Sequence, residues 1–402
     1  MISCIFSSRA ARALGTLAVI AAVLAPAGAA PYLPQRDDEV LERLPLKAAD
    51  PRSRELRALR ERLAANPQDA AIAVELARRY AGLAAEEGDP RYVGYAQAAL
   101  APWWSAEDAP AEVLIARAVA KQYRHDFSAA LSDLQRALAR DPRNVDGWSW
   151  RAAVEMVMGD YAAARRSCEQ VRGLGEPLMV TACVANADSM LGRLPESYAA
   201  LRRAYAAARD IRPAQRFWVL KRLADMADRL GEARAAEEYY RQALALGIPD
   251  QYLLAAYADF LLDTGRVREA AALLSDWARS DILLLRLAIA EKDLDPAAHR
   301  RHAAELEARY AASRRRGERL HIGDEARFAL EVRGDARTAL AFALENWTTQ
   351  REPADARAVL EAALAAGDPA AAAPVLDWMA ANRLQHARLE ALAARARGTG
   401  AR

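Results

Sequence analysis

Several residue types are scarce in this chain of 402 residues, and their scarcity excludes several kinds of protein. Aromatic residues make up only 7% of the sequence, and no stretch alternates β-branched residues, so almost no sheet is expected. Histidine occurs only five times, and there is no phosphate-binding loop, dinucleotide fingerprint, HExxH or Gly-x-Ser-x-Gly motif. We therefore predict that the protein is not an enzyme and uses no cofactor.

An excess of one charge is also lacking. The formal net charge is +2, and Arg9 and Arg12 near the start supply it, so the rest of the chain is neutral. Nucleic-acid binding needs a basic face, and we expect no such partner. His299 and His302 are three residues apart, but Arg300 and Arg301 between them would repel a cation, and we predict no metal site.

Residues 1–29 have the pattern of a secretory signal peptide. Two arginines precede the apolar stretch 14–24, and Ala27-Gly28-Ala29 provides the small-residue cleavage pattern. We predict cleavage after Ala29, which places the mature chain in the periplasm or outside the cell. An uncleaved anchor is the alternative, but prolines and glycines interrupt the apolar zone. No second apolar segment of spanning length follows, so no transmembrane segment is expected after cleavage.

A small signature recurs along most of the mature chain, in which a helix-breaking glycine is followed five residues later by a small residue. The spacing between glycines is 33 residues from Gly159 to Gly192 and 34 from Gly231 to Gly265. Glycine permits a tight turn, and a small residue lets two helices approach closely, so the pattern predicts stacked helical hairpins. The pairs are Gly159 and Ala164, Gly192 and Ser197, Gly231 and Ala236, Gly265 and Ala270, Gly334 and Ala339, and Gly367 and Ala372.

These units resemble the tetratricopeptide repeat (TPR) family. The closest match runs from Ala111 to Asn144, with the turn His125-Asp126-Phe127 and the exit Asp141-Pro142, and the next unit has the turn Gly159-Asp160-Tyr161. The resemblance implies an all-α, right-handed superhelical solenoid of helix-turn-helix hairpins. It covers 67–382 in about nine hairpins, most clearly 111–280, and implies that each hairpin touches only its immediate neighbours.

The flanking regions complete the predicted organisation. Residues 30–66 form a proline-containing arm and a short helix, and 383–402 form a capping helix and tail. The unit at 281–316 departs from the pattern, because its turn Asp293-Leu294-Asp295-Pro296 contains no glycine.

The two cysteines of the mature chain, Cys168 and Cys183, predict one disulfide in an oxidising compartment. The repeat frame puts them in the second helix of one hairpin and the first helix of the next. A bridge there would close a loop of about 15 residues and contribute about 3 kcal/mol in the chain-entropy model. The alternative is two buried free thiols that behave as small apolar residues.

In the family, the first helix of each hairpin lines a concave groove, and the resemblance implies groove positions with aromatic and polar side chains. Aromatic residues would anchor a partner, Lys221 and Arg222 could hold a carboxylate, and Asn186 could bond an extended backbone. The alternative is that Trp150 and Trp218 pack between hairpins. The predicted partner-binding residues are Trp150, Asn186, Trp218, Lys221, Arg222, Asp225, Tyr252 and Asp259.

The resemblance therefore implies an exported TPR scaffold or adaptor that binds a partner protein or an extended peptide, within an envelope assembly. Ala116, Ala153 and Ala256 stand where the carboxylate-gripping members of the family need Lys or Asn, so that mode is not expected. The alternative function is a component of polysaccharide secretion or cell-wall maintenance that binds a glycan or its export machinery.

Overall fold

The computed structural model describes residues 50–317 and 322–399, and the chain divides into two units, Met1–Arg54 and Glu55–Arg402. The predicted signal peptide and most of the predicted arm lie outside the described residues. Within the described ranges every regular element is helical, as the composition and the repeat pattern predicted.

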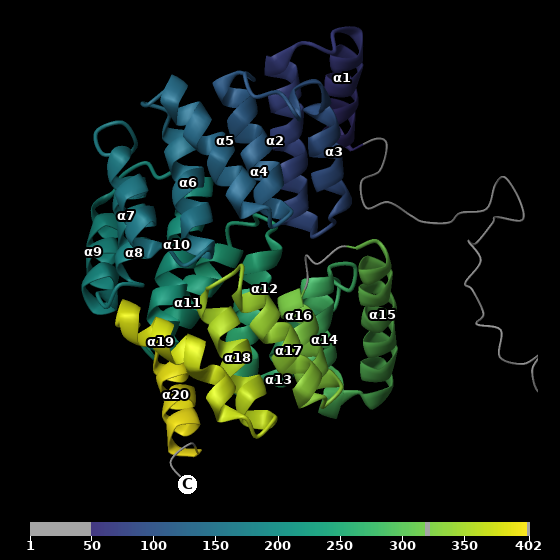
Figure 1. The fold of residues 1–402 in the computed structure, drawn as a ribbon, viewed down its shortest axis with the longest axis vertical. Helices are drawn as coiled ribbons and strands as arrows, with labels where there is room; N and C mark the ends of the chain where they lie inside the picture. Colours follow the sequence, from purple (N-terminus) through teal and green to yellow (C-terminus); the bar gives the residue numbers. More distant parts are fainter. Residues whose placement is uncertain (1–49, 318–321, 400–402) are drawn as a thin grey trace, which may run out of the picture. The chain divides into compact units, whose positions relative to one another are not determined.

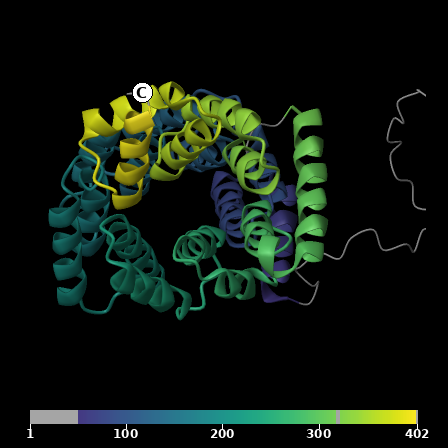
Figure 2. The ribbon, with the colours of Figure 1, turned by 90° about the horizontal axis from the view of Figure 1, so that it is seen from below.

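Successive helices pack in pairs, and the pairs follow one another along a curved path (Figures 1 and 2). A first helix, α1 (Pro51–Ala65), precedes them. The pairs are α2 (Ala70–Glu87) with α3 (Arg91–Ala99), α4 (Ala111–Tyr123) with α5 (Phe127–Arg140), α6 (Val145–Val157) with α7 (Tyr161–Gln170), α8 (Pro177–Asp188) with α9 (Leu194–Ala207), α10 (Pro213–Arg229) with α11 (Ala233–Leu244), α12 (Gln251–Asp263) with α13 (Val267–Leu274), and α14 (Asp281–Leu294) with α15 (Pro296–Arg315).

The last part of the chain is less regular. α16 (Ile322–Arg327) runs into a π-helical turn, η2 (Phe328–Val332), and both pack on α17 (Ala336–Trp347). α18 (Pro353–Ala365) is followed by a 3-10 turn, η3 (Pro369–Ala372), and by α19 (Ala373–Asn382). α20 (Ala387–Thr399) lies where the capping helix was predicted, and it packs against α18.

The glycine turns adopt the geometry that the signature predicted. Gly159, Gly192, Gly231, Gly265, Gly334 and Gly367 all have positive φ, from 69° to 79°. The aspartate that follows Gly159 caps the next helix, because the Asp160 side chain accepts a hydrogen bond from the Ala163 backbone at 2.9 Å. The small residues Ala164, Ala236 and Ala270 are completely buried. The signature is thus a turn, a cap and a close helix contact.

A buried ion pair fixes the hairpin of α4 and α5. Arg117 is 2% exposed, and its Nη2 donates to Asp133 Oδ1 at 2.6 Å while Lys121 Nζ donates to Oδ2 at 2.7 Å. Arg117 Nη1 also donates to the backbone carbonyls of Trp104 at 3.0 Å and Ala106 at 2.9 Å. A buried charge needs such partners, so this cluster ties the preceding loop to the hairpin. The repeat pattern gave no sign of it.

The prediction that each hairpin touches only its immediate neighbours is wrong. The Arg351 backbone N–H donates to the Val157 carbonyl at 2.9 Å, and Gln385 Oε1 accepts from the Leu194 N–H at 2.8 Å. Tyr161 and Met190 share one buried core with α16 to α20. We call the contact of Val157, Tyr161, Met190 and Leu194 with Arg351, Trp378 and Gln385 the seam.

The seam exists because the path of the hairpins curves back on itself (Figure 2). In Figure 1, α18 to α20 lie below α6 to α10. The same curvature brings the end of α2 to the start of α12, where Gln251 Nε2 donates to the Ala84 carbonyl at 3.4 Å. α20 is therefore more than an end cap, since Arg388 also pairs with Asp263 of α12 at 3.0 Å.

The irregular unit predicted at 281–316 is α14 with the 20-residue helix α15. Its turn works without glycine because no residue from 293 to 296 has a positive φ. The acidic cap is kept, since the Asp295 carboxylate accepts hydrogen bonds from the Ala297 and Ala298 backbone at 3.0 Å each.

Candidate partner-binding groove

The predicted groove lies along the first helices of the hairpins, and we call the exposed face of these helices the wall. On this wall Ser149 and Ala153 of α6 and Tyr252 and Ala256 of α12 are exposed, while the opposite faces of both helices are buried. Tyr252 is 44% exposed, which is unusual for so large a side chain in this molecule. The wall therefore offers accessible surface in the predicted frame.

The structure brings together three of the predicted residues from two neighbouring hairpins. Arg222 Nη1 lies 3.4 Å from Asn186 Oδ1, and the guanidinium lies 5.7 Å from the centre of the Trp218 ring. Among the described residues, no carboxylate forms an ion pair with Arg222, and its buried Nε donates to no partner. Arg222 is thus a guanidinium with unused hydrogen-bond donors.

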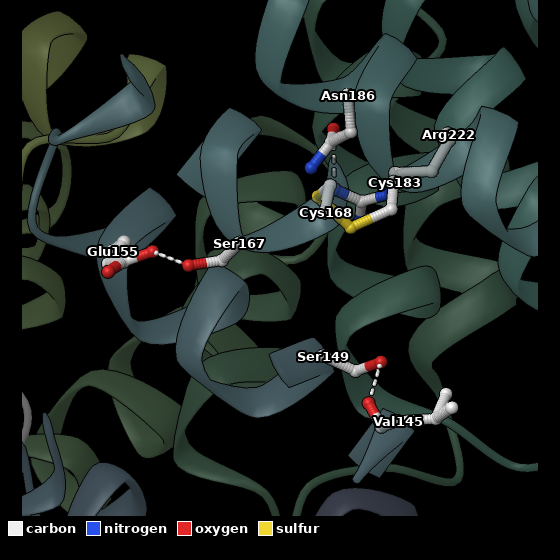
Figure 3. Close-up of a disulfide and its surroundings, with 8 residues drawn as sticks. All are labelled: Val145, Ser149, Glu155, Ser167, Cys168, Cys183, Asn186 and Arg222. Carbon is white, nitrogen blue, oxygen red and sulfur yellow. Dashed lines mark hydrogen bonds between the residues drawn. A yellow bond between two sulfur atoms is a disulfide. The ribbon is translucent and has the colours of Figure 1, made fainter. Parts of the chain in front are cut away.

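The predicted disulfide between Cys168 and Cys183 is present and lies directly beside this group (Figure 3). It joins α7 to α8, with the two Cα atoms 5.6 Å apart. Next to Cys168, Ser167 Oγ donates to Glu155 Oε2 at 2.6 Å, and Arg151 Nε donates to Glu155 Oε1 at 2.9 Å. These bonds join α7 to α6, and the bridge joins α7 to α8, the helix that carries Asn186.

Other predicted charges are already neutralised within the protein. Lys221 Nζ donates to Asp250 Oδ1 at 2.8 Å, so its ammonium is not left to hold a partner's carboxylate. Burial lowers the pKa of Lys221, and Asp250 opposes that effect. Asp225 accepts from Arg229 at 3.3 Å.

Asp259 is also compensated, by two cations from later hairpins. Its carboxylate pairs with Arg286 at 2.8 Å and with Arg327 at 2.5 Å. Burial alone would raise the pKa of Asp259, but the two guanidinium groups outweigh it and hold the pKa at about 2.

The aromatic residues of the predicted set divide between packing and exposure. Trp218 is half-buried and packs against the core of α8 to α12, as the alternative interpretation proposed, yet its ring also faces Arg222. Trp150 is half-buried on α6. Tyr252 lies 6.0 Å from Lys221 Nζ, measured from the centre of its ring.

Helices that are distant from Tyr252 in sequence contribute groups that act on its phenol. Surrounding protein raises the pKa of its phenol, and groups from other hairpins raise it further. These groups are Tyr123 of α4, Asp250 before α12, Asp324 of α16 and Glu352 before α18.

Three further carboxylates in this part of the molecule were not indicated by the repeat pattern. Desolvation by surrounding protein and the neighbouring Asp355 raise the pKa of Glu352 to about 7, although part of this side chain is exposed, and Arg222 partly opposes the shift. Burial raises the pKa of Asp355 to about 6, although it accepts hydrogen bonds from Asn346 and the Glu352 backbone. Burial together with Asp225 and Asp263 raises the pKa of Asp228 to about 6. Sequence offered no signal for Glu352, because only the seam brings it near Arg222.

The two histidines considered for metal binding serve the α14–α15 hairpin instead. His299 Nδ1 lies 2.8 Å from the Ala288 carbonyl, and His302 Nδ1 lies 2.7 Å from Glu291 Oε2. In residues 50–317 and 322–399 no group of three metal-ligating side chains comes together. Across the same residues, no helix has the length and apolar character needed to span a bilayer.

No family model matches the chain, and no curated protein sequence does. Several solved structures do match the chain. A tetratricopeptide repeat protein from Parabacteroides merdae is 14% identical with a TM-score of 0.44, over 60% of this chain and 92% of its own. The human IFIT1 dimer with m7Gppp-AAAA is 13% identical with a TM-score of 0.46, over 87% of each chain.

The APC/C hetero-tetramer Cut9–Hcn1 is 13% identical with a TM-score of 0.41, over 86% of this chain. This chain spans only 52% of the length of that one. At this level of similarity, no ligand or partner of these proteins is carried over to this chain. The glycine turns, caps and paired helices described above define the class of the protein, which is a TPR-like, all-helical repeat fold.

Proposed function

We propose that this protein is an exported, non-enzymatic scaffold that holds an extended segment of a partner protein against its concave wall, within an envelope assembly. The observation that carries the proposal is Arg222, a guanidinium without a carboxylate partner among the described residues, placed over Trp218 and beside Asn186. Arginine and tryptophan are the residues that most often anchor protein interfaces.

The chemistry of this group suits a peptide. The Asn186 amide uses its oxygen for Arg222, so its Nδ2 is free to donate to a backbone carbonyl. Arg222 offers a fork of donors to a carbonyl or a carboxylate, and the Trp218 face gives apolar area. The disulfide holds α8 in place, which lowers the entropic penalty of ordering the site on binding.

Two observations support the location. The predicted signal peptide at 1–29 would direct the chain out of the cytosol. The Cys168–Cys183 disulfide is a bond that persists in oxidising compartments and is rare in the cytosol.

Affinity capture with the oxidised full-length protein tests the proposal. Wild type should retain a partner from an envelope extract. The double variant Trp218→Ala with Arg222→Ala should bind it at least about tenfold more weakly, since the loss of even one anchor worth about 2 kcal/mol exceeds a factor of ten in affinity. Arg234→Ala, which removes an exposed charge from the second helix α11, is the matched control and should capture normally.

Helicity by circular dichroism should be the same for all three proteins. Full capture by the double variant would show that the partner does not bind at this group. A glycan screen run in parallel separates the alternative function, because retention of a glycan without any captured protein would favour a role in polysaccharide export.

A further inference from the structure

The loop before α18 brings a carboxylate to the part of the wall that carries Arg222. The Arg351 backbone N–H donates to the Val157 carbonyl at 2.9 Å, which attaches this loop to the end of α6. Glu352 is the next residue. The guanidinium of Arg222 acts on its carboxylate, and the carboxylate in turn acts on the phenol of Tyr252. Glu352 therefore lies beside the wall, although it comes from a hairpin far along the chain.

Glu352 and Arg222 interact through space, but no ion pair joins them. Among the described residues, no lysine or arginine pairs with Glu352, and no carboxylate pairs with Arg222. A capping box at the start of α18 involves Glu352 and Asp355. An ionised carboxylate has about four acceptor positions, so this cap leaves room for a cation. Each of the two opposite charges is therefore open to a third group.

Negative charge is in excess around Glu352. Two carboxylates act on it, Asp355 and Asp225, and a single cation, Arg222. Asp225 is already paired with Arg229 at 3.3 Å, whereas only neutral amide N–H groups among the described residues donate to Asp355. Desolvation and this excess raise the pKa of Glu352 to about 7, so its ionisation carries a penalty that a second cation would remove.

The carboxylate is accessible from solvent in a concave part of the surface. Glu352 is exposed, and Tyr252 is 44% exposed, yet protein from several hairpins surrounds both side chains and raises the pKa of both. Exposure and surrounding protein occur together where a surface curves inward. A charged side chain that enters such a place is partly shielded from water, and its attraction to an opposite charge is stronger than on an open surface.

The other carboxylates of the wall are not open in this way. Asp250 pairs with Lys221 at 2.8 Å, and Asp259 pairs with Arg286 at 2.8 Å. An acidic segment would find Arg222 but would be repelled by the carboxylates around Glu352. The charges of the wall are therefore complementary to a basic segment.

We propose that the partner segment held at Trp218 and Arg222 carries a lysine or arginine side chain that binds Glu352. A backbone carbonyl of the segment accepts from Arg222, and the basic side chain reaches across to the loop before α18. This inference rests on the proposed function, since it states the chemistry of the segment that the same wall holds.

Selection from a library of random linear peptides displayed on phage, with the oxidised full-length protein as target, tests this proposal. Wild type should enrich peptides that share a lysine or arginine at one position. Glu352→Lys should instead enrich peptides with an aspartate or glutamate at that position, because the charge that reads it is reversed. Glu196→Lys, which reverses an exposed charge on α9, is the matched control and should enrich the same peptides as wild type.

Isothermal titration calorimetry with one enriched peptide then measures the pair directly. Glu352→Gln should weaken binding by about threefold to fivefold, the loss expected for a partly exposed ion pair. Replacing the basic residue of the peptide by norleucine should weaken binding to wild type by a similar factor. The two changes together should weaken binding no more than either alone, because both remove the same contact.

The outcomes separate this inference from the function on which it rests. If wild type enriches no peptide, both are overturned. If Trp218→Ala with Arg222→Ala abolishes the enrichment, but the peptides share no basic residue or Glu352→Lys enriches the same ones, the proposed function stands and this inference is wrong. Should Glu352→Lys lose helicity by circular dichroism, the calorimetry with Glu352→Gln decides, and an unchanged affinity there overturns the inference.

Discussion

The hairpins from Ala111 to Leu274 and the helices after Ile322 use the same kind of turn, but they differ in what the ends of their helices touch. Within the first region, the turn at Gly265 has open space around it, whereas a side chain added at Gly192 would meet Arg383 of the second region. Most contacts of the first region join helices of the same or successive hairpins. The second is specified partly by the surface of the first, through the seam.

The compensation of carboxylates does not follow the same division. Asp133 and Asp250 of the first region each have a lysine or arginine partner. Asp228 of the first region and Glu352 of the second have no ion-pair partner among the described residues, and their pKa values are raised to about 6 and about 7. These two carboxylates carry an energetic penalty when ionised.

The largest effect is expected from breaking the seam at Tyr161. This buried ring lies 6.2 Å from Trp378, and its hydroxyl donates to the Arg351 carbonyl. Tyr161→Ala should lower the free energy of unfolding by about 3–5 kcal/mol, as for other large-to-small core changes. Hydrogen exchange should accelerate in α18 to α20, which are far from it in sequence.

The matched control is Tyr240→Ala, which truncates an equally buried tyrosine in the regular region. It should destabilise by a similar amount without selectively accelerating exchange in α18 to α20. Unchanged exchange there in Tyr161→Ala would mean that the seam does not hold the C-terminal helices.

An intermediate effect is expected from two glycines in equivalent turns. Gly192 and Gly265 have φ of 72° and 75°, so alanine at either position should cost about 1–2 kcal/mol of backbone strain. At Gly192 the new Cβ would also lie 2.8 Å from Arg383 Cβ and 3.0 Å from the Arg383 carbonyl, whereas Gly265 has no neighbour within 4 Å.

Gly192→Ala should therefore lower the melting temperature more than Gly265→Ala, as measured by differential scanning calorimetry. Equal losses would mean that the chain at Arg383 moves away from the turn without penalty, and the seam would be looser than described.

The smallest effect is expected from the pH dependence of Glu352. Because its pKa is raised to about 7 in the folded protein, its contribution favours folding most below the ordinary value of 4.5 and is lost as pH rises through 7. His386 has its pKa lowered to about 3, mainly by burial and next by Arg229, and its contribution is lost as pH falls below 6.5. Between pH 6.5 and 8.5 the change should therefore come mainly from Glu352.

In that range the melting temperature of wild type should fall more steeply than that of Glu352→Gln. Glu196→Gln, an exposed change on α9, should keep the wild-type slope. Parallel slopes for wild type and Glu352→Gln would rule out a raised pKa at this residue.

The parts of the fold that could be predicted from the sequence are those that depend on residues close along the chain. The turn at Gly159, the small residue at Ala164 and the bridge from Cys168 to Cys183 all lie within one or two hairpins. The repeat frame also put Asn186 and Arg222 in the first helices of successive hairpins, but their contact at 3.4 Å was not predicted.

What could not be predicted depends on how far the hairpins curve. Arg327 reaches Asp259 and Arg351 reaches Val157 only because small rotations between successive hairpins add up along the array. No local sequence pattern indicates the total rotation between distant hairpins. The neutralisation of Asp259 was missed for this reason, and so was the presence of Glu352 beside the groove.

The seam has a consequence for how such a chain can change in length. A solenoid with free ends tolerates the loss or duplication of a whole repeat, since every unit meets an equivalent neighbour. Here Tyr161 bonds to a residue 190 positions later in the chain, and that match requires a fixed number of hairpins in between. Deleting or duplicating one of them would move Arg351 away from Tyr161. The seam therefore fixes the number of hairpins between these two residues.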